Sequence, residues 1–212
     1  LTSYPDVGMS CWSLAPGGAW VASARVDMGG AVTLRLHSTR TGKLYLEHVL
    51  ASDGEFHGMH AIAVDDTASC LLFADEQGLV GFGVDAKKTL SARFHLPKER
   101  CRSLAIFGER FVATTERKAK LVALVGQVEA GAELHRVAVN ADYAGGNAQR
   151  CTWLAHSEKA LTQSQVALKS GTLTSKKLAG AFGKPSWRPL VAFDAESGKV
   201  AVVVGETLTI HS

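Results

Sequence analysis

A short pattern of apolar segments recurs along this chain, and the recurrence constrains its fold more than any other feature. Each copy consists of an apolar segment, a turn and a second apolar segment, and five copies occur within the 212 residues. They begin at Cys11, Met59, Cys101, Cys151 and Arg188, so the successive spacings are 48, 42, 50 and 37 residues. A period of this size indicates supersecondary units that bury their apolar faces against one another.

Two further segments follow each of the first four copies. The third segments cover residues 31–37, 79–84, 121–125 and 165–168, and the fourth segments cover residues 44–50, 90–96, 134–139 and 173–178. The fourth segments alternate apolar and polar residues, as half-exposed outer strands do. The first two segments are more continuously apolar, which is typical of buried inner strands.

Four strands per unit with this period predict an all-β fold, a β-propeller built from four-stranded antiparallel blades. We expect one propeller domain over residues 1–212. Its five visible blades are expected at about residues 8–52, 56–97, 98–141, 148–180 and 185–212. The fifth unit ends after its third strand. Residues 1–7 therefore either supply the missing strand and close a five-bladed ring, or the chain is part of a larger propeller.

A second fold is compatible with some of the apolar spacing. Helices at residues 98–111 and 152–170 would give a two-domain α+β chain, but this interpretation discards the five-fold register. The sequence also begins at Leu1, without a basic-then-apolar leader, and we expect it to be a piece of a longer protein.

Three turn-and-strand segments carry a family resemblance. They are residues 15–23 (Ala-Pro-Gly-Gly-Ala-Trp-Val-Ala-Ser), 39–44 (Thr-Arg-Thr-Gly-Lys-Leu) and 194–201 (Asp-Ala-Glu-Ser-Gly-Lys-Val-Ala). Over nearly all of its length the chain resembles the WD-repeat propeller family and its divergent relatives. The chain departs from the family because no Gly-His pair opens a blade and no Trp-Asp pair closes one. The resemblance therefore implies the architecture but not the family's hydrogen-bonded His-to-Asp tetrad.

Composition excludes several classes of protein. The apolar fraction of 46% and charged fraction of 20% are those of a globular chain, and no apolar run is long enough to span a membrane. Four cysteines lie at positions 11, 70, 101 and 151 without a Cys-x-x-Cys pair, so no zinc site is predicted. We expect buried, reduced thiols and an intracellular location, cytoplasmic or nuclear.

The sequence offers little for catalysis. It contains neither of the glycine-rich nucleotide motifs, and residues 142–147 are interpreted as a turn. His57 and His60, with Asp53 and Glu55, could offer metal ligands, but they fall between two blades and are interpreted as a surface loop. No acid recurs in the first strands, where enzymatic propellers place groups around the channel. We therefore predict no catalytic residue, no metal, no cofactor and no enzyme activity.

Charge is segregated along the chain. Residues 44–86 hold eight acids and no Lys or Arg, residues 87–120 hold ten basic residues and three acids, and residues 159–193 hold six basic residues and no acid. Such charged sectors steer partners and fix their orientation, although the charges on solvated faces can also segregate by chance. The candidate partner-binding residues are Asp65, Asp66, Asp75 and Glu76 in the acidic segment, and Lys98, Arg100, Arg102, Arg117, Lys118, Lys120, Lys176, Lys177, Lys184, Trp187 and Arg188 in the basic ones.

Three functions follow, in order of preference. The first is a non-catalytic protein–protein interaction scaffold whose partners are other protein subunits of a larger assembly. The second is a nucleic-acid-associated module that uses the basic blades, and the third is an enzyme with a site in the central channel.

Three of the four tryptophans, Trp12, Trp20 and Trp153, are predicted to pack in the core. Trp187, flanked by prolines, is interpreted either as packing or as a binding hot spot.

Overall fold

The structure, a computed structural model, describes most of the chain as strands and turns. The described residues are 10–27, 29–50, 59–117, 120–138, 143–146, 150–157, 160–178, 190–193, 199–204 and 207–211. They form five antiparallel sheets and contain no helix. The α+β alternative is therefore wrong, because residues proposed for its helices lie in strands instead. The chain divides into two units, residues 1–101 and residues 102–212, which are described separately.

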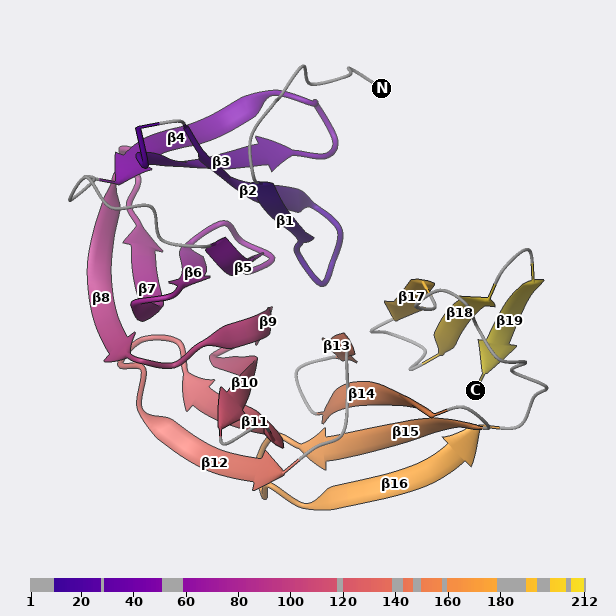
Figure 1. Cartoon of the computed structure of the whole chain (residues 1–212). Helices are drawn as coiled ribbons and strands as arrows, with labels where there is room; N and C mark the ends of the chain where they lie inside the picture. Colours follow the sequence, from indigo (N-terminus) through magenta and orange to yellow (C-terminus); the bar gives the residue numbers. More distant parts are fainter. Residues whose placement is uncertain are drawn as a thin grey trace. The chain divides into compact units, whose positions relative to one another are not determined.

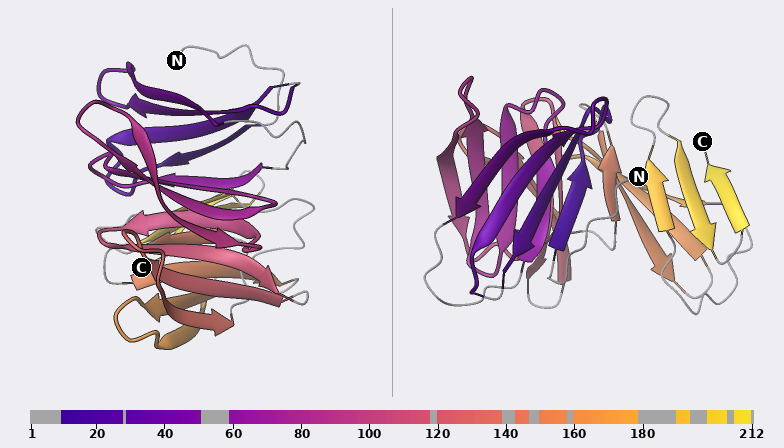
Figure 2. Two further views of the ribbon diagram at one scale, coloured as in Figure 1. Left: turned by 90° about the vertical axis from the view of Figure 1, so that its left-hand side faces the viewer. Right: turned by 90° about the horizontal axis from the view of Figure 1, so that it is seen from above.

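The first unit contains two four-stranded sheets, whose strands can be followed in Figures 1 and 2. Sheet 1 consists of β1 (Ser10–Leu14), β2 (Trp20–Val26), β3 (Val32–Ser38) and β4 (Leu44–Leu50). Sheet 2 consists of β5 (Met59–Val64), β6 (Cys70–Asp75), β7 (Gly78–Val84) and β8 (Leu90–Pro97). In both sheets each strand pairs with the next strand in the sequence, so both are four-stranded meanders of the predicted kind.

The second unit contains three sheets. Sheet 3 consists of β9 (Cys101–Phe107), β10 (Arg110–Arg117), β11 (Lys120–Gln127) and β12 (Glu133–Ala138). Sheet 4 consists of β13 (Tyr143–Gly146), β14 (Arg150–Ser157), β15 (Ala160–Ala167) and β16 (Leu173–Leu178). Sheet 5 consists of β17 (Leu190–Phe193), β18 (Val200–Val204) and β19 (Thr207–His211). Strand order follows the sequence in all three sheets.

Sheet 4 differs from its predicted strand assignment. The segment at Cys151 is the second strand of the sheet, because β13 precedes it and pairs with it from Tyr143 to Gly146. The turn expected at residues 142–147 is therefore wrong over most of its length. Likewise, the second segment of this unit and the third, expected at residues 165–168, are not separate strands, because β15 runs without a break from Ala160 to Ala167. Pairing in a sheet uses main-chain groups, so Gly145 and Gly146 can occupy a strand despite their turn-like composition.

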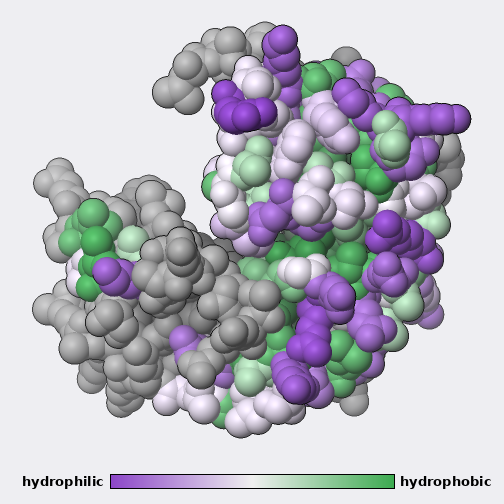
Figure 3. Space-filling model, turned by 180° about the vertical axis from the view of Figure 1, so that it is seen from behind, coloured by the Kyte–Doolittle hydropathy of each residue, from purple (hydrophilic) through white to green (hydrophobic). Residues whose placement is uncertain are grey.

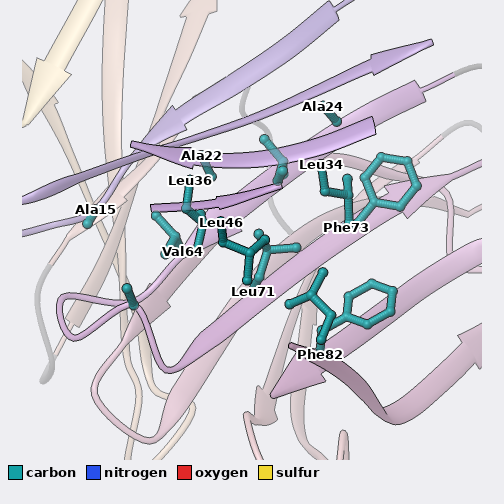
Figure 4. Close-up of a cluster of buried hydrophobic side chains, with 13 residues drawn as sticks. Ala15, Ala22, Ala24, Leu34, Leu36, Leu46, Val64, Leu71, Phe73 and Phe82 are labelled. Atoms are coloured by element: carbon teal, nitrogen blue, oxygen red, sulfur yellow. The ribbon is translucent and has the colours of Figure 1, made fainter. Parts of the chain in front are cut away.

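The core of the first unit lies between sheets 1 and 2. Leu34 and Leu36 of β3 pack with Leu71 and Phe73 of β6 (Figure 4). Ile62 of β5 belongs to the same cluster. Small residues of β2 face the same cluster, which allows the sheets to approach closely. Burying each large aliphatic or aromatic side chain contributes about 1.5–3 kcal/mol, so this interface is the main source of stability in the unit.

Aromatic packing extends this core to its outer rim. Trp20 is half-buried against the cluster, as predicted, and its ring centroid lies 4.8 Å from that of Tyr45. Lys88, in the turn between β7 and β8, places its ammonium 4.6 Å from the centre of the Tyr45 ring. The contact therefore links sheet 2 to the outer strand of sheet 1.

The core prediction for Trp12 is wrong, since 74% of this residue is exposed. The side chain of Trp153, on β14, lies outside the described residues.

A smaller core joins sheets 3 and 4 in the second unit. Val112 and Val125 of sheet 3 pack with Val166 of β15 and with Leu168, which directly follows β15. These are aliphatic residues from second and third strands, as in the first unit. Repeated packing of one sheet on the next is what the sequence period predicted. Within the part of the chain that the structure describes, no helix is long and apolar enough to cross a membrane.

Candidate interaction surface

Three of the four acidic candidates are engaged in turns. Asp65 closes the β5–β6 turn, where its carboxylate accepts hydrogen bonds from the Cys70 main-chain N–H and the Ser69 hydroxyl, both at 2.8 Å, and from the Thr67 hydroxyl. Asp75 accepts hydrogen bonds from the N–H groups of Gln77 and Gly78 at 2.8 and 3.1 Å. Such Asx turns satisfy main-chain donors where the chain reverses.

Asp66 makes a contact between sheets. Its carboxylate accepts a hydrogen bond from the main-chain N–H of Gly17, which lies in the β1–β2 turn of sheet 1. Glu76 is exposed in the turn between β6 and β7. Much of the acidic segment therefore reflects turn chemistry, which the sequence analysis treated only as surface charge. A binding role for these four acids remains a prediction.

The same turn chemistry recurs elsewhere in the first unit. Asp27 accepts hydrogen bonds from the N–H groups of Gly29 and Ala31 between β2 and β3. Asp85 accepts equivalent bonds from Lys87 and Thr89 between β7 and β8. An aspartate at the first position of a hairpin turn is therefore a structural element of both sheets.

The basic candidates are distributed over several elements. Lys98 and Arg100 are exposed between β8 and β9, and Arg102 is exposed on β9. Arg117 and Lys120 are cross-strand partners at the ends of β10 and β11. Lys176 and Lys177 are consecutive residues of β16. The other candidates of the basic segments lie outside the described residues, namely Lys118, Lys184, Trp187 and Arg188.

Apolar residues on sheet 1 form a surface that the sequence analysis missed. Trp12 and Leu14 of β1 are 74% and 52% exposed, and Leu44 and Val49 of β4 are exposed as well. We call these four residues the Trp12 face. The period of two along a strand places Trp12 and Leu14 on the side of β1 opposite Cys11 and the sheet 1–sheet 2 core.

Polar residues complete this side of sheet 1. Strand pairing places Ser23 opposite Trp12, Arg35 opposite Ser23, and Glu47 opposite Arg35. The Arg35 Nε atom lies 2.7 Å from a Glu47 carboxylate oxygen, and both side chains remain partly exposed. The surface thus combines an aromatic anchor with aliphatic residues and a paired charge, a composition found in protein–protein interfaces.

The described thiols are poor nucleophiles. Burial raises the pKa of Cys11 to about 11 and that of Cys70 to about 12, and for Cys70 the nearby Asp65 carboxylate adds to the effect. Cys101 is fully buried, and the Cys151 side chain lies outside the described residues. Since the thiolate is the reactive form, neither Cys11 nor Cys70 is prepared for attack or metal binding near neutral pH.

The candidate metal ligands are only partly placed. Asp53, Glu55 and His57 lie outside the described residues, and His60 falls in β5 and not in a loop. Among the described residues, His, Cys, Asp and Glu side chains form no group of three or more that could hold a metal ion.

Comparison with known proteins identifies the fold. No family model matches the chain, and no curated protein matches it. Solved structures do match. The β-propeller domain of Cps50 (Swd1) from Myceliophteria thermophila superimposes with a TM-score of 0.61 at 12% identity, over 96% of this chain and 64% of that one. The fold is a β-propeller. The five sheets are its blades, and sheets 1 to 5 are blades 1 to 5.

Two other similar structures come from proteins of different kinds, a WD40 domain and a synthase. The WD40 domain of SCAP from fission yeast has a TM-score of 0.56 at 13% identity, over 95% of this chain and 59% of that one. Hydrazine synthase from Kuenenia stuttgartiensis has a TM-score of 0.63 at 10% identity, over 89% of this chain and 53% of that one. The chain thus spans between 53 and 64% of the length of the three. Because both WD40 domains and an enzyme share this fold, the fold alone does not assign a function.

Proposed function

We propose that this chain is a non-catalytic protein–protein interaction scaffold, a divergent WD-repeat-like propeller domain or subunit of a larger intracellular protein assembly. WD40 propeller domains are prominent among the similar structures. The proposal treats residues 1–212 as one propeller domain and its partners as other protein subunits.

The likeness to WD40 propeller domains carries this proposal, and the exposed Trp12 supplies a candidate contact. A tryptophan that is 74% exposed keeps a large apolar area in contact with water, and Leu14 lies beside it on the same side of β1. Burial of such area by a partner is favourable, and tryptophan is enriched among residues that dominate binding energy. The aspartates of the neighbouring turns are already engaged within the fold, so the Trp12 face is the better candidate for the contact.

The test is affinity purification of the intact protein, with and without nuclease, followed by mass spectrometry. A stoichiometric protein partner that survives nuclease and moderate salt is expected. The Trp12→Ser variant should lose it, whereas Leu173→Ser, an exposed apolar change on β16, should retain it. Retention of the partner by Trp12→Ser would show that the Trp12 face is not the contact. Purification without any partner would reject the scaffold.

Direct nucleic-acid binding is the second candidate, and the exposure of Lys98 and Arg100 supports it. Phosphate contacts by such residues make binding fall steeply with salt. Replacement of both by glutamate should then weaken binding to a labelled RNA or DNA oligonucleotide and flatten its salt dependence. The matched control is a double glutamate variant of Lys43 and Lys87, two exposed lysines elsewhere on the first unit. Equal binding by both double variants would remove this candidate.

A further inference from the structure

The turns between the third and fourth strands of blades 1 to 4 share one backbone feature. In each turn the first residue donates a main-chain hydrogen bond to a carbonyl oxygen further along the chain, and the residue immediately before that acceptor has a positive φ. In blades 1, 3 and 4 this residue is a glycine, namely Gly42, Gly131 and Gly171, with φ of +65°, +64° and +70°. In blade 2 it is Lys88, with φ of +62°.

Lysine is unfavourable at this position. A left-handed backbone brings the Cβ of an L residue close to the following carbonyl oxygen, a contact that glycine avoids. The turn imposes the conformation, because the Asp85 carbonyl oxygen accepts a hydrogen bond from the Lys88 N–H at 2.9 Å. The Asp85 carboxylate accepts two more from the N–H groups of Lys87 and Thr89, at 2.9 and 2.8 Å. Such strain points to a role for the side chain, because the turn itself needs none.

The Lys88 side chain contacts the neighbouring blade. Its ammonium lies 4.6 Å from the centre of the Tyr45 ring, on the outer strand β4 of blade 1. The Tyr45 ring centroid lies 4.8 Å from that of Trp20, and both aromatic residues are half-buried against the core between blades 1 and 2. A ring face attracts a cation through its quadrupole, so the attraction requires the charge on Lys88. One positive charge thus joins the rims of the two blades.

Two lysines lie side by side in this turn. Lys87 and Lys88 are both exposed, so a small reagent or an enzyme can approach either residue. Among the described residues, the ring contact belongs to Lys88 and not to Lys87. A reaction that removes the charge of a lysine should therefore affect the contact between the blades at one of these positions and not at the other.

We propose that Lys88 is an acylation site, and that acylation releases the rim of blade 1 from blade 2. The neutral amine of Lys88 attacks the carbonyl carbon of an acyl thioester. A nitrogen–carbon bond forms, the carbon–sulfur bond breaks, and the thiol leaves with a proton from the amine. The product is an uncharged amide, which the Tyr45 ring does not attract as it attracts a cation.

Release of the side chain uncovers an aromatic ring. The described surface in Figure 3 is a mosaic of hydrophilic and apolar residues. Acylation of Lys88 would add the Tyr45 ring to the apolar part of the surface and loosen the outer strand β4 that carries it. This inference assigns a modification to the chain itself and does not depend on the proposed scaffold function.

The first experiment measures the reactivity of the two amines. The folded full chain is incubated with acetyl-coenzyme A, and peptide mass spectrometry follows acetylation at Lys87 and Lys88. We expect acetylation at both positions. The ratio of the Lys88 rate to the Lys87 rate should rise about two- to fivefold in Tyr45→Leu, because the amine of Lys88 reacts only after it leaves the ring. Tyr45→Phe keeps an aromatic face and should leave the ratio unchanged.

The second experiment measures the effect on the blades. Acetyl-lysine is incorporated during translation at position 88, or at position 87 in the matched control, and hydrogen exchange of β4 (Leu44–Leu50) is followed by mass spectrometry. Acetylation at position 88 should accelerate exchange about two- to fivefold, and acetylation at position 87 should not change it. Lys88→Arg keeps a cation and should exchange like the unmodified chain. Both acetylated chains keep Tyr45, so they decide the question even if Tyr45→Leu fails to fold.

Three results would overturn the inference. The first is an unmodified Lys88 under conditions that fully acetylate Lys87, since the amine is then out of reach. The second is the same ratio of rates in Tyr45→Leu as in the unmodified chain. The third is equal exchange of β4 in the two acetyl-lysine chains. The intact protein purified from its own cells should carry acyl groups at Lys88, and acylation confined to other lysines would reject Lys88 as the site.

Discussion

The main-chain N–H of Gly17 donates a hydrogen bond to the carboxylate of Asp66, and this contact joins the inner turn of blade 1 to the inner turn of blade 2. The two residues are 49 positions apart, close to one repeat of the chain. Gly17 is suited to the contact because a Cβ there would lie 2.9 Å from the Asp66 Oδ1 atom. A turn in one blade thus depends on the side chain of the next.

Removing the acceptor should loosen this junction. Asp66→Ala leaves the Gly17 N–H without its partner and should lower the free energy of unfolding by about 1 kcal/mol. Urea denaturation followed by circular dichroism measures the effect. The exposed Glu76→Ala, in the next turn, is the matched control and should change stability by less than about 0.5 kcal/mol. Equal effects of the two variants would show that the junction does not contribute.

The turn aspartates also show where sequence analysis reached its limit. The repeat predicted a turn between the first two segments of the copy that begins at Met59, and the structure has a turn there with Asp65 closing it. In the sequence, an aspartate that accepts main-chain hydrogen bonds within a turn cannot be distinguished from an aspartate whose carboxylate is available to bind a partner. Only the positions of the neighbouring N–H groups distinguish them, and these depend on how the turn folds. The acidic cluster was therefore predicted as a binding surface without its structural role.

Truncation of the blade 1–blade 2 core should be costly. Phe73 is almost fully buried in this core, and Phe73→Ala removes most of its contacts and leaves a cavity. The expected loss is about 3–5 kcal/mol in the free energy of unfolding. Trp12→Ala is the control of similar size, and because the residue is exposed its cost should stay below about 0.5 kcal/mol. Thermal or urea unfolding of both variants measures the difference. A comparable loss in Trp12→Ala would show that Trp12 is buried in solution.

Trp12 also explains why the fold was easier to predict than the surface. The strand pairing shows that Trp12 and Leu14 occupy the same repeat positions as Ile62 and Val64. Ile62 and Val64 are buried because blade 1 packs against them, whereas Trp12 and Leu14 are exposed. The local pattern is the same in both blades, so periodicity predicts a strand in each case. Exposure depends on what covers the strand, which is not encoded in the segment itself.

The opposite failure occurred in blade 4. Its first strand, β13, consists of Tyr143, Ala144, Gly145 and Gly146, and its composition indicates a turn. The strand forms because β14 offers it a pairing edge, a tertiary effect that outweighs local propensity. This error does not change the predicted repeat period, because the number of strands per unit, and not their composition, sets the length of the repeat.

Blade 3 contains a position where only glycine fits. A Cβ on Gly126 of β11 would run into the ring of Phe111, which is fully buried on the neighbouring strand. Gly126→Ala should therefore destabilise the protein by about 1–3 kcal/mol through overpacking. Calorimetry compares this variant with Gly42→Ala. A Cβ at Gly42 would meet no atom within 4 Å, and the φ of this residue is +65°, so the control measures the cost of backbone strain alone. If Gly126→Ala costs no more than Gly42→Ala, the steric argument fails.

The buried thiol of Cys70 should make stability fall in alkaline solution. Burial raises its pKa from 9.0 to about 12, so between these values the unfolded chain has lost the proton and the folded chain retains it. The folded state then binds more protons than the unfolded state, and stability decreases as pH rises above about 9. The slope reaches about 1.4 kcal/mol per pH unit for one such group.

Urea unfolding at pH 8, 9, 10 and 10.5, about the range in which only the unfolded thiol ionises, isolates this contribution. Cys70→Ala should unfold at lower urea throughout because a buried side chain is truncated. Above about pH 9 its stability should decline less steeply than that of the unmodified chain, by up to the slope of one group. Cys11, with a pKa raised to about 11, contributes in the same direction and remains in both proteins, so it cancels in the difference. Parallel pH profiles for the two proteins would show that Cys70 ionises as easily in the folded state as in the unfolded chain, and that blade 2 does not exclude water from it.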